Sequence, residues 1–223
     1  MRVSGVLLAA GASTRFGSPK MLAPMGEEKE PLLRKVIGTW LGAGFDDVIV
    51  VLGCGAADIR ATFEENEDFL RSVKSGEAAA GSVRFVENSE WQAGMFSSVK
   101  AGLRATSAGS THVAISPADI PFLSKSSLRT ILSAATSLDA GGFGLAVPTH
   151  GGRRGHPLLI PAALRARLLS WPDSARLNQL FQEPDVTVHC LEGFDDSILH
   201  DVDRPEDLQK PTARRSSSSS FLF

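Results

Sequence analysis

Short apolar runs alternate along the chain with longer segments in which apolar residues recur at helical spacing. The runs are rich in β-branched residues, and a strand that is buried on both faces produces such a continuous apolar run. On this basis we predict strands over residues 3–10, 47–53, 83–88, 112–117, 143–149, 157–161 and 186–191. The helical spacing predicts helices over residues 31–44, 56–73, 94–105 and 126–138, with two shorter helices before the last strand.

The alternation of strand and helix predicts an α/β fold with a mostly parallel, mixed sheet that helices cover on both faces. We therefore expect a single-domain, three-layer α/β/α architecture of the Rossmann-like kind over residues 1–210. The two strands around 143–161, which a polar turn separates, are expected to break the parallel order. Residues 211–223 form a Ser-rich, low-complexity tail that we predict to be disordered.

Composition narrows the class of protein. The formal net charge of −2 implies no broad basic patch, so we do not expect nucleic acid as a partner. Cys54 and Cys190 have neither metal-binding nor disulfide spacing, and both are predicted to be buried or partly buried thiols. No apolar run approaches the ~20 residues of a membrane span, and the short apolar start is not a secretory signal. We expect a cytoplasmic protein with no membrane partner.

The first loop carries cations among small residues. In open α/β sheets, ligands bind beyond the carboxyl ends of the strands, and the segment "LLAAGASTRFGSPK" begins at such an end. Small residues such as Gly11 let backbone N–H groups approach phosphate oxygens, and Arg15 and Lys20 supply positive charge. The spacing matches neither a Walker A loop nor the dinucleotide fingerprint. A phosphate-binding loop and an ordinary loop with surface cations both remain open on spacing alone.

Carboxylates that could bind a metal lie in two other segments. Asp119 comes directly after the strand over 112–117, where it could be a Mg²⁺ ligand or an ordinary loop residue beside prolines. Asp201 and Asp203 alternate with Val202, so on an extended segment they share one face, and carboxylates on one face repel unless a cation lies between them. The alternative is that Asp203 caps the helix near Pro205 while Asp207 is solvated.

Two further segments could line a site at the same edge. Gly94, Met95 and Ser98 lie at the start of a predicted helix, where they could face a ligand or simply begin the helix. The glycine-rich segment "GGRRGHP" contains Arg154 and His156 and could bind an acceptor or form a polar turn.

Together these motifs resemble those of a known family. "LAAGASTRFGSPK" is similar to the signature of nucleotidyltransferases with a glycosyltransferase-A-like fold. "LAAG", "NSEWQAGMFSS", "ADIP", "RRGHP" and "DVDRPEDL", in this order, resemble the molybdenum cofactor cytidylyltransferases and their MobA-like relatives. Ala10 before Gly11 resembles the cytidylyl branch. Phe16 stands where Met is common, and "ADIP" lacks a Gln that cytidylyltransferases often have between Asp and Pro.

The resemblance implies a role for each matching residue. Arg15, Lys20 and Asp119 would be catalytic. Asp119 would hold Mg²⁺, with Asp203 as the second metal carboxylate and Asp201 as a further companion. The nucleotide would be bound by Leu8, Ala9, Ala10, Gly11, Ser13, Arg15, Lys20, Gly94 and Ser98. The acceptor would be bound by Met95, Arg154 and His156.

The implied reaction is Mg²⁺-dependent transfer of CMP from CTP to the phosphate of molybdopterin, with release of pyrophosphate. An acceptor phosphate is already ionised at neutral pH, so the protein needs to align and neutralise anions rather than supply a base. Two alternatives stay open: a nucleotidyltransferase for a sugar phosphate or another small phosphate, and a non-catalytic carrier of the molybdenum cofactor. A molybdoenzyme apo-protein is a further partner that the resemblance suggests.

Overall fold

The chain folds around one mixed sheet that is mostly parallel. The computed structural model describes residues 1–64, 81–138 and 142–209. The sheet has the order β10-β7-β9-β6-β1-β4-β5, with β8 paired to β7, and a small separate hairpin joins β2 to β3. The strands are β1 (Val3–Ala9), β2 (Pro24–Met25), β3 (Glu30–Pro31), β4 (Asp47–Leu52), β5 (Ser82–Glu87), β6 (His112–Pro117), β7 (Gly144–His150), β8 (Arg153–Arg154), β9 (Leu158–Pro161) and β10 (Thr187–Leu191).

Strand direction follows the expectation from the sequence. β1 pairs in parallel with β4 and β6, and β4 pairs in parallel with β5. β9 is antiparallel to both β6 and β7, so the break in parallel order at 143–161 is confirmed. Because β6 and β7 run in the same direction, the carboxyl ends of β1, β4, β5, β6 and β7 all meet at one edge of the sheet.

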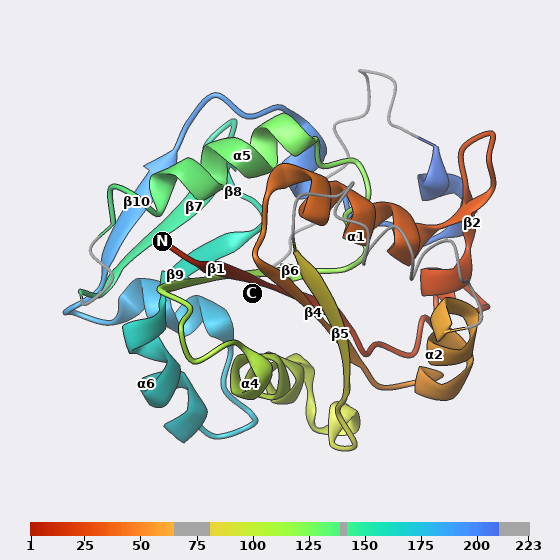
Figure 1. Cartoon of the computed structure of the whole chain (residues 1–223), viewed down its shortest axis with the longest axis horizontal. Helices are drawn as coiled ribbons and strands as arrows, with labels where there is room; N and C mark the ends of the chain where they lie inside the picture. The colour runs from red at the N-terminus through yellow and green to blue at the C-terminus, as the bar shows by residue number, and fades with distance from the viewer. Residues whose placement is uncertain (65–80, 139–141, 210–223) are drawn as a thin grey trace.

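Helices cover both faces of the sheet, which confirms the predicted three layers (Figure 1). On one face lie α1 (Leu32–Ala43), α2 (Ala56–Glu64) and α5 (Lys125–Ala134), and on the other lie α4 (Met95–Ala105) and α6 (Arg165–Ser170). Val50 of β4 packs in the core under the first face and Val51 in the core under the second, so neither side of this strand meets water. Burial on both sides explains its unbroken apolar run.

Short 3-10 helices complete the chain: η1 (Lys20–Leu22), η2 (Trp91–Ala93), η3 (Ala162–Leu164), η4 (Leu177–Gln182), η5 (Asp196–Leu199) and η6 (Pro205–Leu208). The sequence pattern missed the β2–β3 hairpin because its strands are too short to show a period. The predicted helix over 56–73 is present to Glu64, and its remainder, like the tail 211–223, lies outside the described residues.

One sequence prediction about the cysteines is wrong. Cys54 is partly buried as expected, but Cys190 is exposed. It lies on β10, which is an edge strand of the sheet, and the side chains of this strand are not covered as those of the central strands are. Within the described ranges, none of the helices has the length and apolar content needed to cross a bilayer.

Helix α4 lies unusually close to the sheet, and Gly102 permits this approach. A Cβ added at Gly102 would lie 2.4 Å from Cγ1 of Val6 and 3.1 Å from Cγ2 of Val51. Both valines are fully buried and stiff at χ1, so neither can move aside cheaply. The absence of a side chain at this position therefore sets the distance between the helix and β1.

We expect Gly102→Ala to destabilise the protein by about 1–3 kcal/mol, because the added methyl group overpacks the core. Gly38→Ala is the matched control: Gly38 lies inside α1, and a Cβ there meets nothing within 4 Å. This control should stabilise the protein by up to about 1 kcal/mol through helix propensity. Urea unfolding of both variants measures the difference, and equal stability would contradict the packing argument.

Candidate functional site

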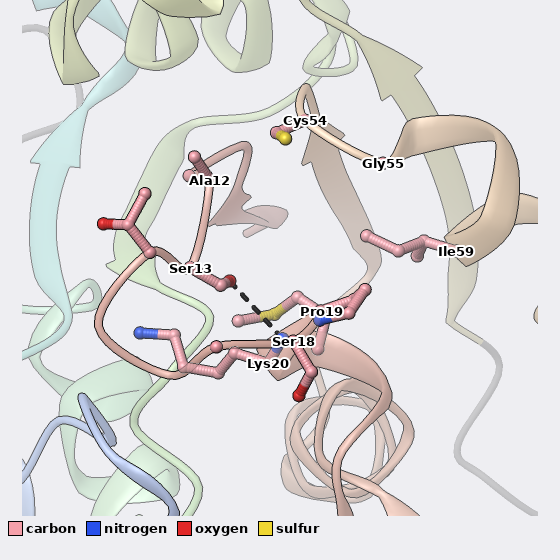
Figure 2. Close-up of a pocket in the computed structure, with 12 residues that line it drawn as sticks. Ala12, Ser13, Ser18, Pro19, Lys20, Cys54, Gly55 and Ile59 are labelled. Atoms are coloured by element: carbon pink, nitrogen blue, oxygen red, sulfur yellow. Dashed lines mark hydrogen bonds between the residues drawn. The ribbon is translucent and has the colours of Figure 1, made fainter.

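The loop after β1 is a compact turn built around Ser13. The Ser13 carbonyl accepts hydrogen bonds from the backbone N–H of Phe16 (3.0 Å) and Gly17 (3.2 Å). The Ser13 hydroxyl accepts a bond from the backbone N–H of Lys20 at 3.4 Å (Figure 2). Gly17 has a φ of +79°, a conformation that favours glycine, and Phe16 is anchored in the core. The turn thereby leaves Arg15 exposed and directs Lys20 inward.

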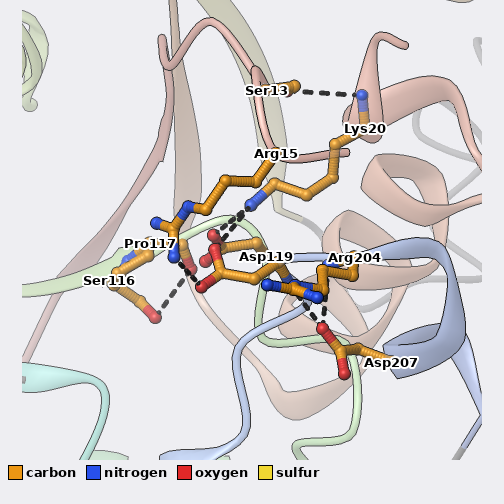
Figure 3. A network of polar contacts seen from close by, with 9 residues as sticks. Ser13, Arg15, Lys20, Ser116, Pro117, Asp119, Arg204 and Asp207 are labelled. Atoms are coloured by element: carbon orange, nitrogen blue, oxygen red, sulfur yellow. Dashed lines mark hydrogen bonds and ion pairs between the residues drawn. The ribbon is translucent and has the colours of Figure 1, made fainter. Parts of the chain in front are cut away.

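Three ion pairs link this loop to the carboxylates at the sheet edge. The Nζ atom of Lys20 lies 2.6 Å from Oδ2 of Asp119 and 4.0 Å from Oδ1 of Asp203. Nη1 of Arg15 lies 2.5 Å from Oδ2 of Asp203. Figure 3 shows the Lys20 side chain reaching toward Asp119, with Arg15 beside it. The structure thus brings together four of the residues that the sequence marked, from three distant parts of the chain.

The segment around Asp203 is held by backbone hydrogen bonds. The N–H of Val202 donates to the carbonyl of Asp119 at 2.8 Å, and the Val202 side chain is buried. The carboxylate of Asp207 accepts from the N–H groups of Asp203 (3.0 Å) and Arg204 (2.8 Å). The capping role considered for Asp203 therefore belongs to Asp207, which is not simply solvated. Asp203 is free of that role and turns to Arg15 instead.

The carboxylates are arranged so that a cation would suit them. The Oδ1 atom of Asp119 is buried and accepts no hydrogen bond from any described residue, which is unfavourable for a carboxylate oxygen. Burial raises the pKa of Asp201, and the charges of Asp119 and Asp203 raise it further. Both observations fit a hard cation such as Mg²⁺, which prefers carboxylate oxygens and commonly shares them with substrate phosphates.

The protein groups do not form a complete metal cage. Among residues 1–64, 81–138 and 142–209, no cluster of three His, Cys, Asp or Glu side chains is arranged to hold a metal ion. Asp119 and Asp203 could therefore supply part of the coordination of a Mg²⁺ ion, and phosphate oxygens and water would supply the rest.

A cavity of about 340 Å³ lies between the first loop and the end of β4 (Figure 2). Gly11, Ser13 and Lys20 line it from the loop, and Cys54 and Ile59 line it from the opposite side. The sequence pattern did not mark these last two residues. The available signal was that the predicted strand over 47–53 ends at Gly53, so the residues after it lie at the same sheet edge.

Gly53 lets three segments meet beside this cavity. A Cβ at Gly53 would lie 2.7 Å from both the carbonyl oxygen of Ala10 and the Cβ of Trp91. The N–H of Cys54 donates to the same Ala10 oxygen at 3.1 Å. Ala10 itself is buried, as is Ala9, whereas Leu8 is partly buried at the end of β1. The strand end and the first loop are thus fixed to each other.

The start of α4 is a second wall near this edge. Gly94 precedes the helix with a φ of +117°, and Met95, its first residue, has 54% of its surface exposed. Ser98 is buried, and its hydroxyl accepts a hydrogen bond from Nδ2 of Asn88 at 3.0 Å. Of the three marked residues here, only Met95 presents a large side chain to solvent.

Arg154 lies on β8, which pairs with β7, and His156 lies between β8 and β9, so both are on the far side of β6 from the first loop. Strands are about 4.8 Å apart, so β7 lies roughly 10 Å from β6, with β9 between them. The guanidinium carbon of the exposed Arg154 lies 4.4 Å from the ring centroid of Phe181. Burial lowers the pKa of His156 to about 4, so its imidazole is neutral at pH 7.

Two known proteins are similar to this chain over most of its length. Nicotine blue oxidoreductase from Paenarthrobacter nicotinovorans is 30% identical over 223 residues, covering 93% of this chain and 95% of that protein. Molybdenum cofactor cytidylyltransferase from Escherichia coli (strain K12) is 23% identical over 202 residues, covering 91% of each chain.

Solved structures share the fold. Rv0371c from Mycobacterium tuberculosis H37Rv has a TM-score of 0.69 at 23% identity, covering 93% of this chain and 96% of that chain. The complex of Rv0371c with manganese has a TM-score of 0.65 at 22% identity, covering the same shares, 93% and 96%. A nucleotidyl transferase from Methanothermobacter has a TM-score of 0.67 at 23% identity, covering 92% of this chain and 94% of that chain.

A family model also matches most of the chain. The model of the MobA-like NTP transferase domain covers residues 5–188, which include every strand from β4 to β9 and all but the start of β1. This match agrees with the fold and with the marked loop after β1. The chain belongs to the MobA-like NTP transferase domain family.

Proposed function

We propose that this chain is a Mg²⁺-dependent nucleotidyltransferase that transfers CMP from CTP to the phosphate of molybdopterin. The observation that carries the proposal is the meeting of Lys20 and Arg15 with Asp119 and Asp203 at the carboxyl edge of the sheet. Cations for a triphosphate and carboxylates for a metal lie within a few ångströms of each other. Such an arrangement suits transfer of a nucleotidyl group between two anions.

The reaction balances without a protein base. An oxygen of the acceptor phosphate attacks the α-phosphorus of CTP, and the bond from that phosphorus to the bridging oxygen of pyrophosphate breaks. Lys20 neutralises charge at the α-phosphate, and Arg15 binds the departing phosphates. Asp119 and Asp203 would hold a Mg²⁺ ion, which stabilises negative charge on the phosphate oxygens when bound. Arg154 orients the far end of the acceptor.

The proposal also specifies the nucleotide, CTP, and the acceptor, molybdopterin. They are supported by the "LAAG" and "RRGHP" motifs and by the 23% identity to a molybdenum cofactor cytidylyltransferase. Arg154 lies on β8, across β6 from the first loop, where it would contact the second part of an extended acceptor whose phosphate reacts near Lys20. Turnover of a sugar phosphate in place of molybdopterin would keep the mechanism and change the acceptor.

A second candidate is an oxidoreductase. It is favoured by one observation, the 30% identity to nicotine blue oxidoreductase across 93% of the chain. Such an enzyme would transfer two electrons from a donor such as a reduced nicotinamide dinucleotide and release no pyrophosphate. Assays of pyrophosphate release and of nicotinamide oxidation on the same preparation separate the two candidates.

Lys20→Met and Asp119→Asn should each lower kcat for pyrophosphate release about 100-fold or more, because each removes a charged group from the reacting centre. Lys35→Met and Asp58→Asn are matched controls, since both residues are exposed on helices on the α1 side of the sheet. Near wild-type turnover in either of the first two variants, with CTP, Mg²⁺ and molybdopterin, would reject the proposed mechanism.

The ion pairs also predict how metal and nucleotide bind. Each carboxylate that would bind the metal is already paired with a cation that would bind phosphate. Binding of one ligand releases the protein group that the other needs, so each should raise the affinity for the other by the same factor. Lys20→Met should bind Mn²⁺ alone several-fold more tightly than wild type, and should lose most of this coupling.

Electron paramagnetic resonance titration with Mn²⁺, with and without CTP, measures both effects. The Lys35→Met variant, which keeps the ion pairs, should match wild type. Weaker Mn²⁺ binding by Lys20→Met in the absence of nucleotide would contradict the prediction.

A further inference from the structure

Asn88 is a buried residue for which the mechanism above has no role. It follows β5 directly and has 6% of its surface exposed. The sequence contains it in "NSEWQAGMFSS", yet neither the phosphate loop nor the carboxylates involve it. We propose that Asn88 is a positioning residue, which fixes the first turn of α4 as the wall of the nucleoside side of the site. This inference rests on the proposed nucleotidyltransferase function.

The side-chain amide of Asn88 ties several segments together. Nδ2 donates to the hydroxyl oxygens of Ser97 (2.9 Å) and Ser98 (3.0 Å), and Oδ1 accepts from the N–H of Glu90 at 3.1 Å. The backbone N–H of Asn88 donates to the carbonyl of Leu52 at 2.8 Å. The start of α4 is thereby held at a fixed place relative to the end of β4.

An amide is the group that this position requires. Ser97 already uses its hydroxyl proton, because its oxygen lies 2.9 Å from the Glu90 carbonyl oxygen and 2.7 Å from the Gly94 carbonyl oxygen. The hydroxyl therefore needs a donor from Asn88, which a carboxylate cannot provide. Through Ser97, the amide also constrains the Gly94 turn, from which the exposed Met95 side chain follows.

The order of the strands puts Asn88, Ser97 and Ser98 on the side of the site that we assign to the nucleoside. Asp119 follows β6, the phosphate loop follows β1, and Asn88 follows β5, in the spatial order β6-β1-β4-β5. With the phosphates at Lys20 and Arg15 and the acceptor toward β7, the ends of β4 and β5 are left for the sugar and base. The contacts of Gly53 with Ala10 and Trp91 join the phosphate loop to this same wall.

A ligand that has the phosphates but no sugar or base distinguishes a loss of nucleoside positioning from general damage to the site. Inorganic triphosphate with Mg²⁺ engages the phosphate loop and the carboxylates but not the nucleoside wall. Asn88→Ala should weaken CTP binding about tenfold or more and leave inorganic triphosphate binding within twofold of wild type. Discrimination between CTP and GTP should fall by a similar factor, measured by isothermal titration calorimetry with Mg²⁺ present.

Gln92→Ala is the matched control, because Gln92 is an exposed amide in the neighbouring η2 turn. It should bind both ligands as wild type does. Ser98→Ala removes only one contact of the Asn88 amide and should show the same pattern at about threefold, which keeps the test valid if Asn88→Ala fails to fold.

The outcomes distinguish this inference from the function on which it rests. If wild type binds neither CTP nor inorganic triphosphate, both proposals are rejected. If wild type binds both and the Asn88 and Ser98 variants bind CTP normally, only the positioning role is rejected. An equal loss of both ligands in folded variants also overturns it, because the damage would then extend to the phosphate side.

Discussion

The ion pair between Lys20 and Asp119 is the interaction on which the site depends. It joins residues 99 positions apart: Asp119 lies just past the end of β6, and Lys20 closes the loop that follows β1. The two strands are neighbours in the sheet, so the backbone pairing of β1 with β6 brings the ammonium and the carboxylate together. Arg15 and Asp203 form a second ion pair beside it, in which the Arg15 side chain is far more exposed than that of Lys20.

Backbone contacts fix the positions of these charged groups. The turn around Ser13 directs Lys20 inward, and the bond from Val202 to Asp119 places the Asp201–Asp203 segment against β6. Membership in the MobA-like NTP transferase domain family agrees with this arrangement, in which a rigid sheet positions the short loops that carry the functional residues.

Much of the fold was predictable because buried parallel strands leave continuous apolar runs, as in β4. The charged residues of the site were predictable because loops after such strands meet at one edge. The sequence did not mark Asn88 and Cys54 as site residues, because a single amide or thiol shows no periodicity and its partners lie on other elements. Spacing alone allowed Asp203 either to face a metal or to cap the helix near Pro205, with Asp207 solvated. The three-dimensional course of residues 201–207 gives the capping bonds to Asp207 and turns Asp203 toward Arg15.

The close approach of α4 to the sheet at Gly102 has a dynamic consequence. With the helix backbone pressed against Val6 and Val51, the helix has no smooth surface along which to slide or rotate. Shear motion, in which packed helices shift to close a cleft, is therefore blocked on this face. On this face, closure around a ligand is left to the loops at the strand ends, and α4 is a fixed reference against which they move.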